Sequence, residues 1–332
     1  MNLLLQSLEL ALQRFFSVCH GACKYGLKNV RFSDILVDGG IRQQEEQTMA
    51  IKLLVDSASD ISLEEANAMG IDMIPMTISF DEEEYRDGVD LTRKEFFEKL
   101  IESRELPKTS QINMFQFEEC MRELTADGSE VVAVTLSSKL SGTYANAVQA
   151  AEAFGGKVHV LDSLNASAGE RILVQQALRL IEKGLSAQEV VRQLEEERGR
   201  IRFIALLDTL EYLQKGGRVS AITAMTGTAL HIKPVISVTD GEVKSIGKAI
   251  GSKKGNNLLM QTIGKCGGID FDMPYEAVFS GLEDSLLQKY LQDSAVLWQD
   301  EVEHVPSCCI GSTIGTHIGP GAIGVAFFAK DA

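Results

Sequence analysis

Residues 130–143 read EVVAVTLSSKLSGT, and this stretch carries the main information about the fold. Its first half, Glu130–Leu136, is an apolar run with three valines, which is typical of a buried strand. Its second half is a loop of hydroxyl-bearing residues, and a helical pattern follows from Thr143 to Phe154. A buried strand, a polar loop and a helix in this order form the repeating unit of a parallel sheet that is covered by helices.

The same rhythm continues on both sides of this stretch. Ile51–Val55 and Val158–Leu161 are short apolar runs that each end in an Asp-Ser pair, as expected of further buried strands. Three further helices are predicted between Val55 and Glu130, and they begin after Ser62, after Thr92 and at Phe115. We expect the joining segments to be extended over Ile71–Phe80, to turn over Asp81–Tyr85 and to form a loop over Pro107–Gln111.

The pattern changes at about Ala166. Two helices are predicted in succession, over 167–183 and 187–198, and a hairpin around Asp240-Gly241 comes later. A chain of 332 residues corresponds to about two domains at roughly 150 residues each. We therefore predict an α/β fold with a parallel-sheet first domain over 49–165, a smaller α+β second domain over 166–332, and an N-terminal extension over 1–48.

The charge and composition exclude several classes of function. The chain has 32 Lys and Arg residues against 47 Asp and Glu residues, so its net charge is −15. This balance argues against nucleic acid as a partner and against binding to anionic lipid headgroups. No apolar run approaches the roughly 18 residues of a transmembrane segment. The six cysteines lack the spacing of a disulfide framework, which indicates a reducing compartment, and we expect a cytoplasmic protein.

Residues 1–48 differ from the rest of the chain. Leu3–Phe16 has an amphipathic helix pattern, but it lacks the basic start and the small-residue cleavage site of a signal peptide. Cys19, His20 and Cys23 lack the second ligand pair that structural zinc requires, so we expect no metal. A strand begins directly after Met49, and we hypothesise that Met49 is the functional start. Weaker ligand binding by a chain that begins at Met49 would contradict this.

Three predicted strands end in loops with Ser or Thr residues. These loops are Asp56-Ser57, Ser137–Thr143 and Asp162-Ser163. The carboxyl ends of parallel strands share one edge of a sheet, and ligands of open α/β sheets bind there. The middle loop leads into a helix, where backbone N–H groups and hydroxyls can hold an anion and Gly142 permits close approach. Ordinary helix capping would use the same residues.

Other chemistries have little support. No Gly-x-Gly-x-x-Gly follows the first strand, and no phosphate-binding Gly-x-x-x-x-Gly-Lys-Ser/Thr loop occurs. Ser141, His317 and Asp162 would supply the residue types of a hydrolase triad, but no Gly-x-Ser-x-Gly elbow surrounds the serine.

Several motifs occur in the order that is typical of one family. They are Val55-Asp56-Ser57-Ala58-Ser59-Asp60, Lys108-Thr109-Ser110-Gln111, Ser137-Ser138-Lys139-Leu140-Ser141-Gly142-Thr143-Tyr144, Leu161-Asp162-Ser163, Leu210-Glu211-Tyr212-Leu213-Gln214-Lys215-Gly216-Gly217-Arg218-Val219-Ser220, Ile232-Lys233-Pro234-Val235 and His317-Ile318-Gly319-Pro320-Gly321-Ala322. In this set, the chain resembles DegV-family lipid-binding proteins from about residue 51 to 329. Each motif alone is weak, and the ordered set is specific.

The resemblance implies a carrier without catalysis. It implies one long-chain fatty acid as ligand, no cofactor, an acyl chain in a tunnel of the first domain, and a carboxylate near the domain junction. A separate fatty acid kinase would phosphorylate the carboxylate for phospholipid synthesis. Carried over by motif, the ligand-binding residues are Thr109, Ser110, Ser141, Gly142, Thr143, Arg218 and His317.

One segment departs from the family pattern. The resemblance leads us to expect an arginine after the Asp-Gly hairpin, where the kinase would dock, but Lys248–Lys254 contains none. This departure concerns the kinase and leaves fatty-acid binding unaffected. Two alternatives stay open: an enzyme, either a hydrolase using Ser141 or a phosphotransfer component, and a regulatory lipid sensor with the same pocket.

Overall fold

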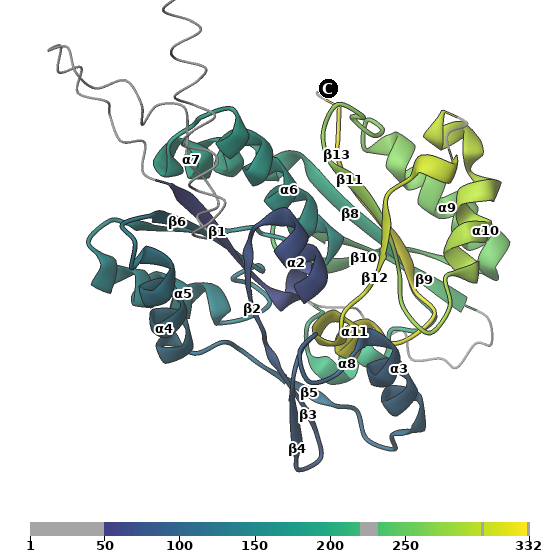
Figure 1. Cartoon of the computed structure of the whole chain (residues 1–332). Helices are drawn as coiled ribbons and strands as arrows, with labels where there is room; N and C mark the ends of the chain where they lie inside the picture. The colour runs from purple at the N-terminus through teal and green to yellow at the C-terminus, as the bar shows by residue number, and fades with distance from the viewer. Residues whose placement is uncertain (1–49, 220–231, 300–301, 331–332) are drawn as a thin grey trace, which may run out of the picture. The chain divides into compact units, whose positions relative to one another are not determined.

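A parallel sheet forms the first layer of the computed structural model, which describes residues 50–219, 232–299 and 302–330 (Figure 1). Its strands are β1 (Ile51–Asp56), β2 (Asp72–Ile74), β6 (Glu130–Thr135) and β7 (Val158–Asp162), in the order β2-β1-β6-β7. All three pairings are parallel, which confirms the α/β prediction made from residues 130–143. The predictions for residues 1–48 and Met49 lie outside the described residues.

Both faces of this sheet are buried by helices. Successive residues of β1 point to opposite faces, so Leu53 and Val55 join one apolar cluster and Leu54 joins another. Helices α4 (Met114–Thr125) and α5 (Thr143–Ala151) cover one face, and α6 (Ala168–Glu182) and α7 (Ala187–Glu197) cover the other. Burial on both faces explains why the strands read as continuous apolar runs.

The second sheet has six strands. They are β8 (Ile201–Leu206), β9 (Ile232–Thr239), β10 (Glu242–Ile250), β11 (Tyr275–Phe279), β12 (Ser307–Cys309) and β13 (Ile323–Phe328). Their order is β10-β9-β8-β13-β11-β12, and every pairing except β11 with β12 is antiparallel. The hairpin predicted around Asp240-Gly241 is confirmed. This sheet is larger than the parallel one, although we expected the smaller part of the fold here, because three late strands return to pair with β8 and with one another.

Helix α6 lies between the two sheets. It contacts β1 and β6 on one side and β8, β11 and β13 on the other. Its apolar residues Ile172, Leu173 and Val174 are consecutive and fully buried, so the helix is apolar on more than one face and must be covered on both sides. Helices α9 (Ser252–Lys265) and α10 (Ser285–Asp293) cover the outer face of the second sheet. The described chain is therefore layered α-β-α-β-α (Figure 1).

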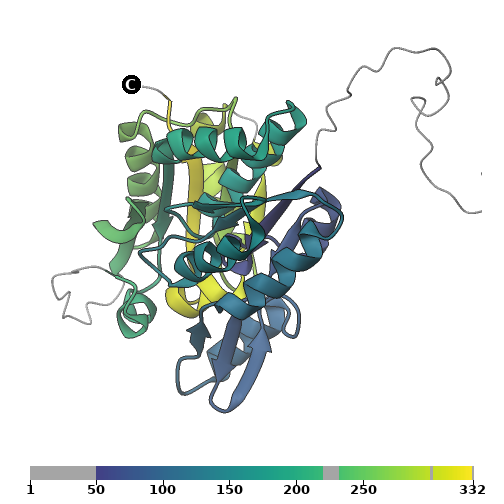
Figure 2. The ribbon, with the colours of Figure 1, turned by 90° about the vertical axis from the view of Figure 1, so that its left-hand side faces the viewer.

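A third, small sheet lies at the lower end of Figures 1 and 2, next to α3 (Arg93–Glu102). It consists of β3 (Thr77–Phe80), β4 (Glu83–Arg86) and β5 (Lys108–Ser110), in the order β4-β3-β5. The turn predicted over Asp81–Tyr85 is present only at Asp81 and Glu82, because Glu83–Arg86 is β4, and the loop predicted over Pro107–Gln111 is wrong at Lys108–Ser110, which is β5. Both segments are polar and without apolar alternation, and they are strands only because they pair with β3.

The remaining helices are short. Helix α2 (Leu63–Met69) begins with the capping box of Ser62 and Glu65 and ends at Gly70. Helices α8 (Glu211–Gly216) and α11 (Ser312–Ile318) lie near each other below the second sheet. Helix α11 was not predicted, because seven residues with glycine and three hydroxyl groups carry little helical signal.

Buried carboxyl groups lie where β1 and β6 end. Asp56 accepts hydrogen bonds from the N–H groups of Ala58 and Leu136, at 2.9 and 2.8 Å, so it joins the carboxyl ends of the two central strands. Burial raises the pKa of Asp56 to about 7. Glu170, in the first turn of α6, is fully buried, and neither of its carboxyl oxygens has a hydrogen-bond partner. Burial raises the pKa of Glu170 well above its ordinary value, and repulsion from Asp56 adds to this.

Glu170→Gln tests this assignment, because it keeps the side-chain shape and removes the titrating group. A carboxyl whose pKa is raised by folding stabilises the protein less as pH rises, by about 1.4 kcal/mol per pH unit between its unfolded and folded pKa. We expect the free energy of unfolding, from urea titrations between about pH 5 and pH 8, to fall less steeply in Glu170→Gln than in the wild type. The same pH dependence in both proteins would contradict the raised pKa.

Candidate functional site

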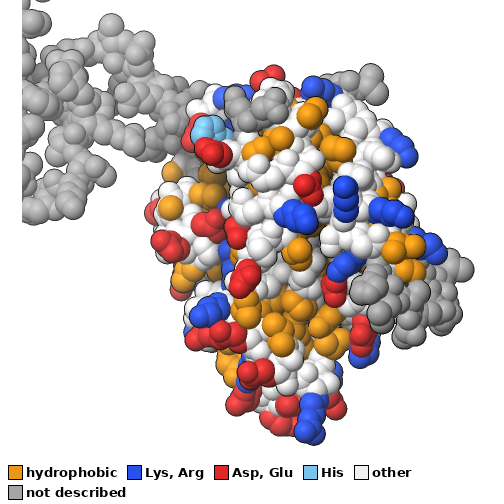
Figure 3. Space-filling view, turned by 90° about the vertical axis from the view of Figure 1, so that its right-hand side faces the viewer, with side chains coloured by type: hydrophobic (Ala, Val, Ile, Leu, Met, Phe, Trp, Pro, Cys, Tyr) orange, Lys and Arg blue, Asp and Glu red, His pale blue; other side chains and the backbone are white. Residues whose placement is uncertain are grey.

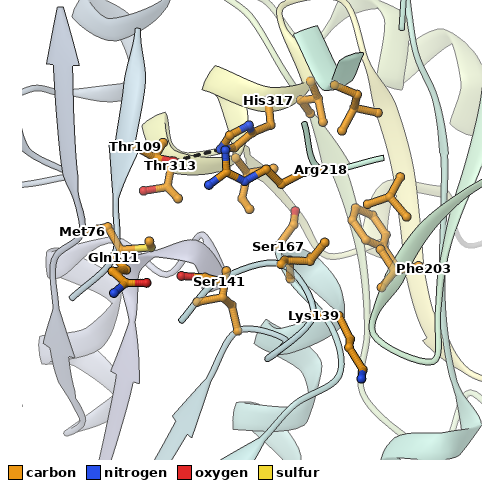
Figure 4. A pocket seen from close by; sticks show the side chains of 18 of the residues that line it. Met76, Thr109, Gln111, Lys139, Ser141, Ser167, Phe203, Arg218, Thr313 and His317 are labelled. Atoms are coloured by element: carbon orange, nitrogen blue, oxygen red, sulfur yellow. Dashed lines mark hydrogen bonds between the residues drawn. The ribbon is translucent and has the colours of Figure 1, made fainter. Parts of the chain in front are cut away.

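A cavity of about 500 Å³ lies at the carboxyl edge of the parallel sheet, facing the second sheet. Five of the seven predicted site residues line it: Thr109, Ser141, Gly142, Arg218 and His317. They come from β5, from the loop after β6, from the turn after α8 and from α11. Figure 4 shows the side chains of Thr109, Ser141, Arg218 and His317 around the cavity. The fold thus brings together residues as far apart in the sequence as Thr109 and His317.

Thr109 and His317 form a pair at one end of the cavity. The Thr109 hydroxyl and His317 Nε2 are 2.9 Å apart (Figure 4). The other ring nitrogen, Nδ1, is buried, and a Cβ atom on Gly216 would lie 2.5 Å from it, so a side chain at position 216 would displace the ring. Burial lowers the pKa of His317 to about 4, and the positive charge of Arg218 adds to this effect. The imidazole is therefore neutral at pH 7.

Ser141 is oriented by its neighbours in the loop before α5. Its hydroxyl lies 2.9 Å from the Thr143 hydroxyl and accepts a hydrogen bond from the Thr143 N–H at 3.2 Å. Thr143 is itself fully buried and does not line the cavity. Gln111, absent from the predicted set although adjacent to it, lines the cavity and packs against the position that a Cβ on Gly142 would occupy.

Ser110 is placed away from the cavity. It is exposed, whereas its neighbour Thr109 is half-buried and lines the cavity. Successive side chains of a strand point to opposite faces, and both residues belong to β5, so only one of them can face inward. The prediction treated the segment as a loop and could not separate the two residues.

Apolar lining residues come from both parts of the fold: Met76, Leu136, Leu140 and Ala166 lie in segments that follow strands of the parallel sheet, and four others lie in the second sheet. Phe203, Ile236, Val238 and Val243 belong to β8, β9 and β10, and they line the cavity with residues of α8 and α11. The cavity is thus not confined to residues 49–165, where the resemblance placed the tunnel. Thr313 and Ser167, which the sequence did not single out, also line it.

The hydrolase triad is not assembled. His317 bonds to Thr109, and the Asp162 carboxylate accepts from the backbone N–H groups of Ser138 and Leu164. Within the described ranges, no hydrogen bond links Ser141 to His317 or His317 to Asp162. Ser141 therefore has no base beside it.

Helix α11, which carries His317, is held by a distant carboxylate. Asp87 is buried, and its oxygens accept hydrogen bonds from the N–H groups of Ser312 and Thr313 at 3.1 and 3.0 Å and from the Thr313 hydroxyl at 2.6 Å. Asp60 accepts a further bond from the Gly311 N–H at 2.8 Å. Unpaired N–H groups at the start of a helix are thus satisfied by residues more than 220 positions away.

A second cavity, of about 290 Å³, lies against the same pair. Thr109, Arg218 and His317 line both cavities, and Lys108 and Lys215 line only the second. The Thr109–His317 pair is therefore reached from two sides, and the second side is rich in positive charge.

Metal sites and membrane-spanning helices are both absent from the described part of the chain. It contains no cluster of three or more His, Cys, Asp or Glu side chains that could hold a metal ion. None of its helices combines the length and the apolar character that crossing a membrane requires.

The fold and the cavity define a layered α/β protein with a pocket at the carboxyl edge of its parallel sheet. The chain matches the family model described as "Uncharacterised protein, DegV family" over residues 50–330, and it belongs to the DegV family. It is 34% identical over 281 residues to a DegV domain-containing protein of Caldanaerobacter subterraneus subsp. tengcongensis. The matched region covers 84% of this chain and 99% of that relative.

Solved structures of the family are also similar. A fatty-acid-binding DegV family protein from Thermus thermophilus is 31% identical with a TM-score of 0.76, over 85% of this chain and 100% of that one. A stearic-acid-binding protein from Eubacterium ventriosum is 25% identical with a TM-score of 0.74, over 83% of this chain and 97% of that one.

Asp87→Ala should destabilise α11 and, through it, the Thr109–His317 pair. Hydrogen bonds to a charged group contribute about 1.5–3 kcal/mol, and the variant leaves two buried N–H groups unpaired. We expect the free energy of unfolding to fall by about 1.5–3 kcal/mol and the His317 ring NMR signals to shift. Asp90→Ala, which removes an exposed carboxylate paired with Arg86, is the control and should change neither quantity appreciably. Equal effects of the two variants would contradict the role of Asp87.

Proposed function

We propose that this protein binds one long-chain fatty acid, with the acyl chain against the second sheet and the carboxylate near Thr109 and Ser141. The observation that carries the proposal is that one cavity is lined by both hydroxyl groups and apolar side chains, with Thr109 and Ser141 on one side and Phe203 on the other (Figure 4). A fatty acid has the same division, and its chain gains about 0.8 kcal/mol per methylene on burial. The Thermus and Eubacterium relatives, which bind fatty acids, support this ligand class.

The polar end offers hydrogen-bond donors, which a carboxylate needs because it only accepts. The hydroxyls of Thr109 and Ser141 can both turn toward a ligand, since each is only half-buried. A neutral His317 can donate from Nε2 or accept there, according to its tautomer. The exposed Arg218 adds a positive charge at the cavity wall. In this proposal Gly142 and Gln111 shape the wall, and Thr143 orients Ser141.

The experiment that tests the proposal is mass spectrometry of ligands released from the denatured, natively purified protein. The expected result is one fatty acid per chain. Delipidated protein should then be stabilised against heat by long-chain acids and little by short-chain acids or sugar phosphates, because a ligand of the folded state raises stability in proportion to its affinity. A polar small molecule in place of the lipid, or turnover that Ser141→Ala abolishes, would favour an enzyme instead.

Thr109→Ala and Ser141→Ala should each weaken fatty-acid binding by roughly 10- to 100-fold, because each removes a donor to a charged group. Ser110→Ala is the matched control, since it removes a hydroxyl from the same strand but on the exposed face. Calorimetric titration of delipidated protein measures all three. Equal affinities of Thr109→Ala and Ser110→Ala would remove Thr109 from the site.

We further propose that the bound carboxylate is presented to a separate fatty acid kinase. The second cavity supports this, because it reaches the Thr109–His317 pair from outside the acyl site and has Lys108, Lys215 and Arg218 in its wall. A kinase could thus approach the headgroup while the acyl chain stays buried. Positive charge there favours an acidic partner surface, although the chain as a whole carries −15.

The docking face in this proposal extends to Lys248–Lys254. Lys253 and Lys254 are exposed in the first turn of α9, where the helix dipole disfavours positive charge. Figure 3 shows Lys and Arg side chains gathered on the side of the molecule where α9 and α10 lie. Residues that are unfavourable for the helix but exposed together are consistent with a partner contact. Lysine cannot reproduce the two parallel hydrogen bonds of the arginine expected there.

Replacing Lys253 and Lys254 by Ala should lower acyl-phosphate formation by the host's own kinase several-fold at low salt, and less at high salt, because exposed charges set the encounter rate. Ile250→Arg, at an exposed position, should raise it. Lys183→Ala is the control, since Lys183 is exposed at the far end of α6. Full acyl-phosphate formation with the double variant would show that Lys253 and Lys254 do not belong to the docking face. If neither the wild type nor any variant supports acyl-phosphate formation, a lipid store or sensor is favoured.

A further inference from the structure

Part of the apolar wall of the cavity is formed by two rows of residues that cross the second sheet, of which Val243, Val238, Phe203 and Ile236 line the cavity. One row joins Val243, Val238, Phe203 and Ala326 across β10, β9, β8 and β13. The neighbouring row joins Ile236, Ala205, Gly324 and Val278 across β9, β8, β13 and β11. Adjacent rows on one face are close enough for a large side chain to reach across. The second row is smallest at Ala205 and Gly324, directly beside the phenylalanine of the first.

The Phe203 ring occupies the space that Gly324 leaves. A Cβ atom on Gly324 would lie 2.9 Å from Cε2 of the Phe203 ring and 3.1 Å from the Ala205 Cβ, both closer than normal van der Waals contact. Gly324 lies in a regular strand and has no positive φ, so the backbone conformation does not require a glycine. What favours glycine is the lack of space for a Cβ atom, which the Phe203 ring limits most closely, followed by the Ala205 Cβ and the Ile204 carbonyl oxygen at 3.2 Å. Phe203 is 6% exposed and also lines the cavity, on the side away from Met76 and Gln111 (Figure 4).

We propose that Phe203, seated against Gly324, sets the length of acyl chain that the protein accepts. The ring has one edge on Gly324 and another in the cavity wall, so any group that displaces it from Gly324 moves it toward the ligand. The polar end is fixed by Thr109 and His317, and the far wall then determines how many methylenes fit between them. This inference rests on the proposed function and adds to it the residues that select the ligand.

Opposite shifts are expected from opposite changes at this contact. Phe203→Ala, or the milder Phe203→Leu, removes ring atoms from the wall, and the optimal saturated fatty acid should become longer. Each further methylene that becomes buried should tighten Kd by roughly fourfold. Gly324→Ala pushes the ring into the cavity, so the longest acids that the wild type binds should weaken by about fourfold or more, while shorter acids keep their affinity.

The double variant Phe203→Ala/Gly324→Ala tests whether Gly324→Ala changes the preferred chain length through the Phe203 ring or by disturbing the fold. Without the ring, the new methyl group no longer meets the one neighbour that also lines the cavity, so the double variant should show the chain-length profile of Phe203→Ala. Gly264→Ala is the matched glycine control, because a Cβ on Gly264 meets nothing within 4 Å. The measurement is Kd for saturated acids from about 12 to 20 carbons on delipidated protein, with thermal melts to confirm folding. Should Gly324→Ala not fold, the two Phe203 variants still test the proposal.

The outcomes separate this inference from the function on which it rests. If the wild type binds no fatty acid of any length, the proposed function fails. If the wild type prefers one chain length and no Phe203 variant changes that preference, the protein still binds fatty acids but Phe203 does not set the chain length. If Gly324→Ala changes the preferred chain length even when Phe203 is replaced by Ala, the proposed role of Phe203 is likewise wrong.

Discussion

The carboxylates of Asp60 and Asp87 are buried, and they accept hydrogen bonds from three successive backbone N–H groups at the start of α11. Because α11 has only seven residues, these bonds satisfy a large share of its unpaired donors. They connect the segments after β1 and β4 to the chain just before its last strand. The placement of His317 against Thr109, and with it the polar end of the cavity, depends on this attachment.

The same region concentrates carboxyl groups in a way that costs stability. Burial raises the pKa of Asp56 to about 7 and that of Asp60 to about 6, and both receive hydrogen bonds that partly oppose the shift. Glu170 has no such bonds in the structure. The positive charge of Arg93 also lowers the pKa of Asp60, whereas the guanidinium of Arg171, next to Glu170 in the sequence, pairs with Glu65 and Glu276. A protein tolerates buried charge of this kind where it holds several segments in one arrangement, and here the arrangement is the edge that carries the cavity.

The two sheets contribute different groups to the lining of the cavity. The loops beyond the parallel strands supply hydroxyls and backbone groups, because polar loops are what lies beyond the carboxyl ends of buried strands. The antiparallel sheet supplies part of the apolar wall, through alternate residues of β8, β9 and β10 that point inward. The pocket, with Thr109 and Ser141 on one side and Phe203 on the other, needs both sheets. The all-round burial of α6 holds the two sheets at a fixed separation.

The sequence alone determined the parallel sheet, the helices on its faces, the β9–β10 hairpin and the motifs that place Thr109, Ser141 and His317 in a site. Local apolar periodicity, capping residues and turn residues determine the strands, helices and hairpin, and they act over a few neighbouring positions. Thr109, Ser141 and His317 were instead assigned from the resemblance of their motifs to the family. The tertiary structure alone decided that β4 and β5 are strands, since their polar residues are ordered only by pairing with β3. It also decided that Ser110 faces outward, that α11 exists and is capped from Asp87, and that part of the apolar wall belongs to the second sheet. Each of these depends on groups brought together from distant parts of the chain, and such contacts leave no periodic pattern in the sequence.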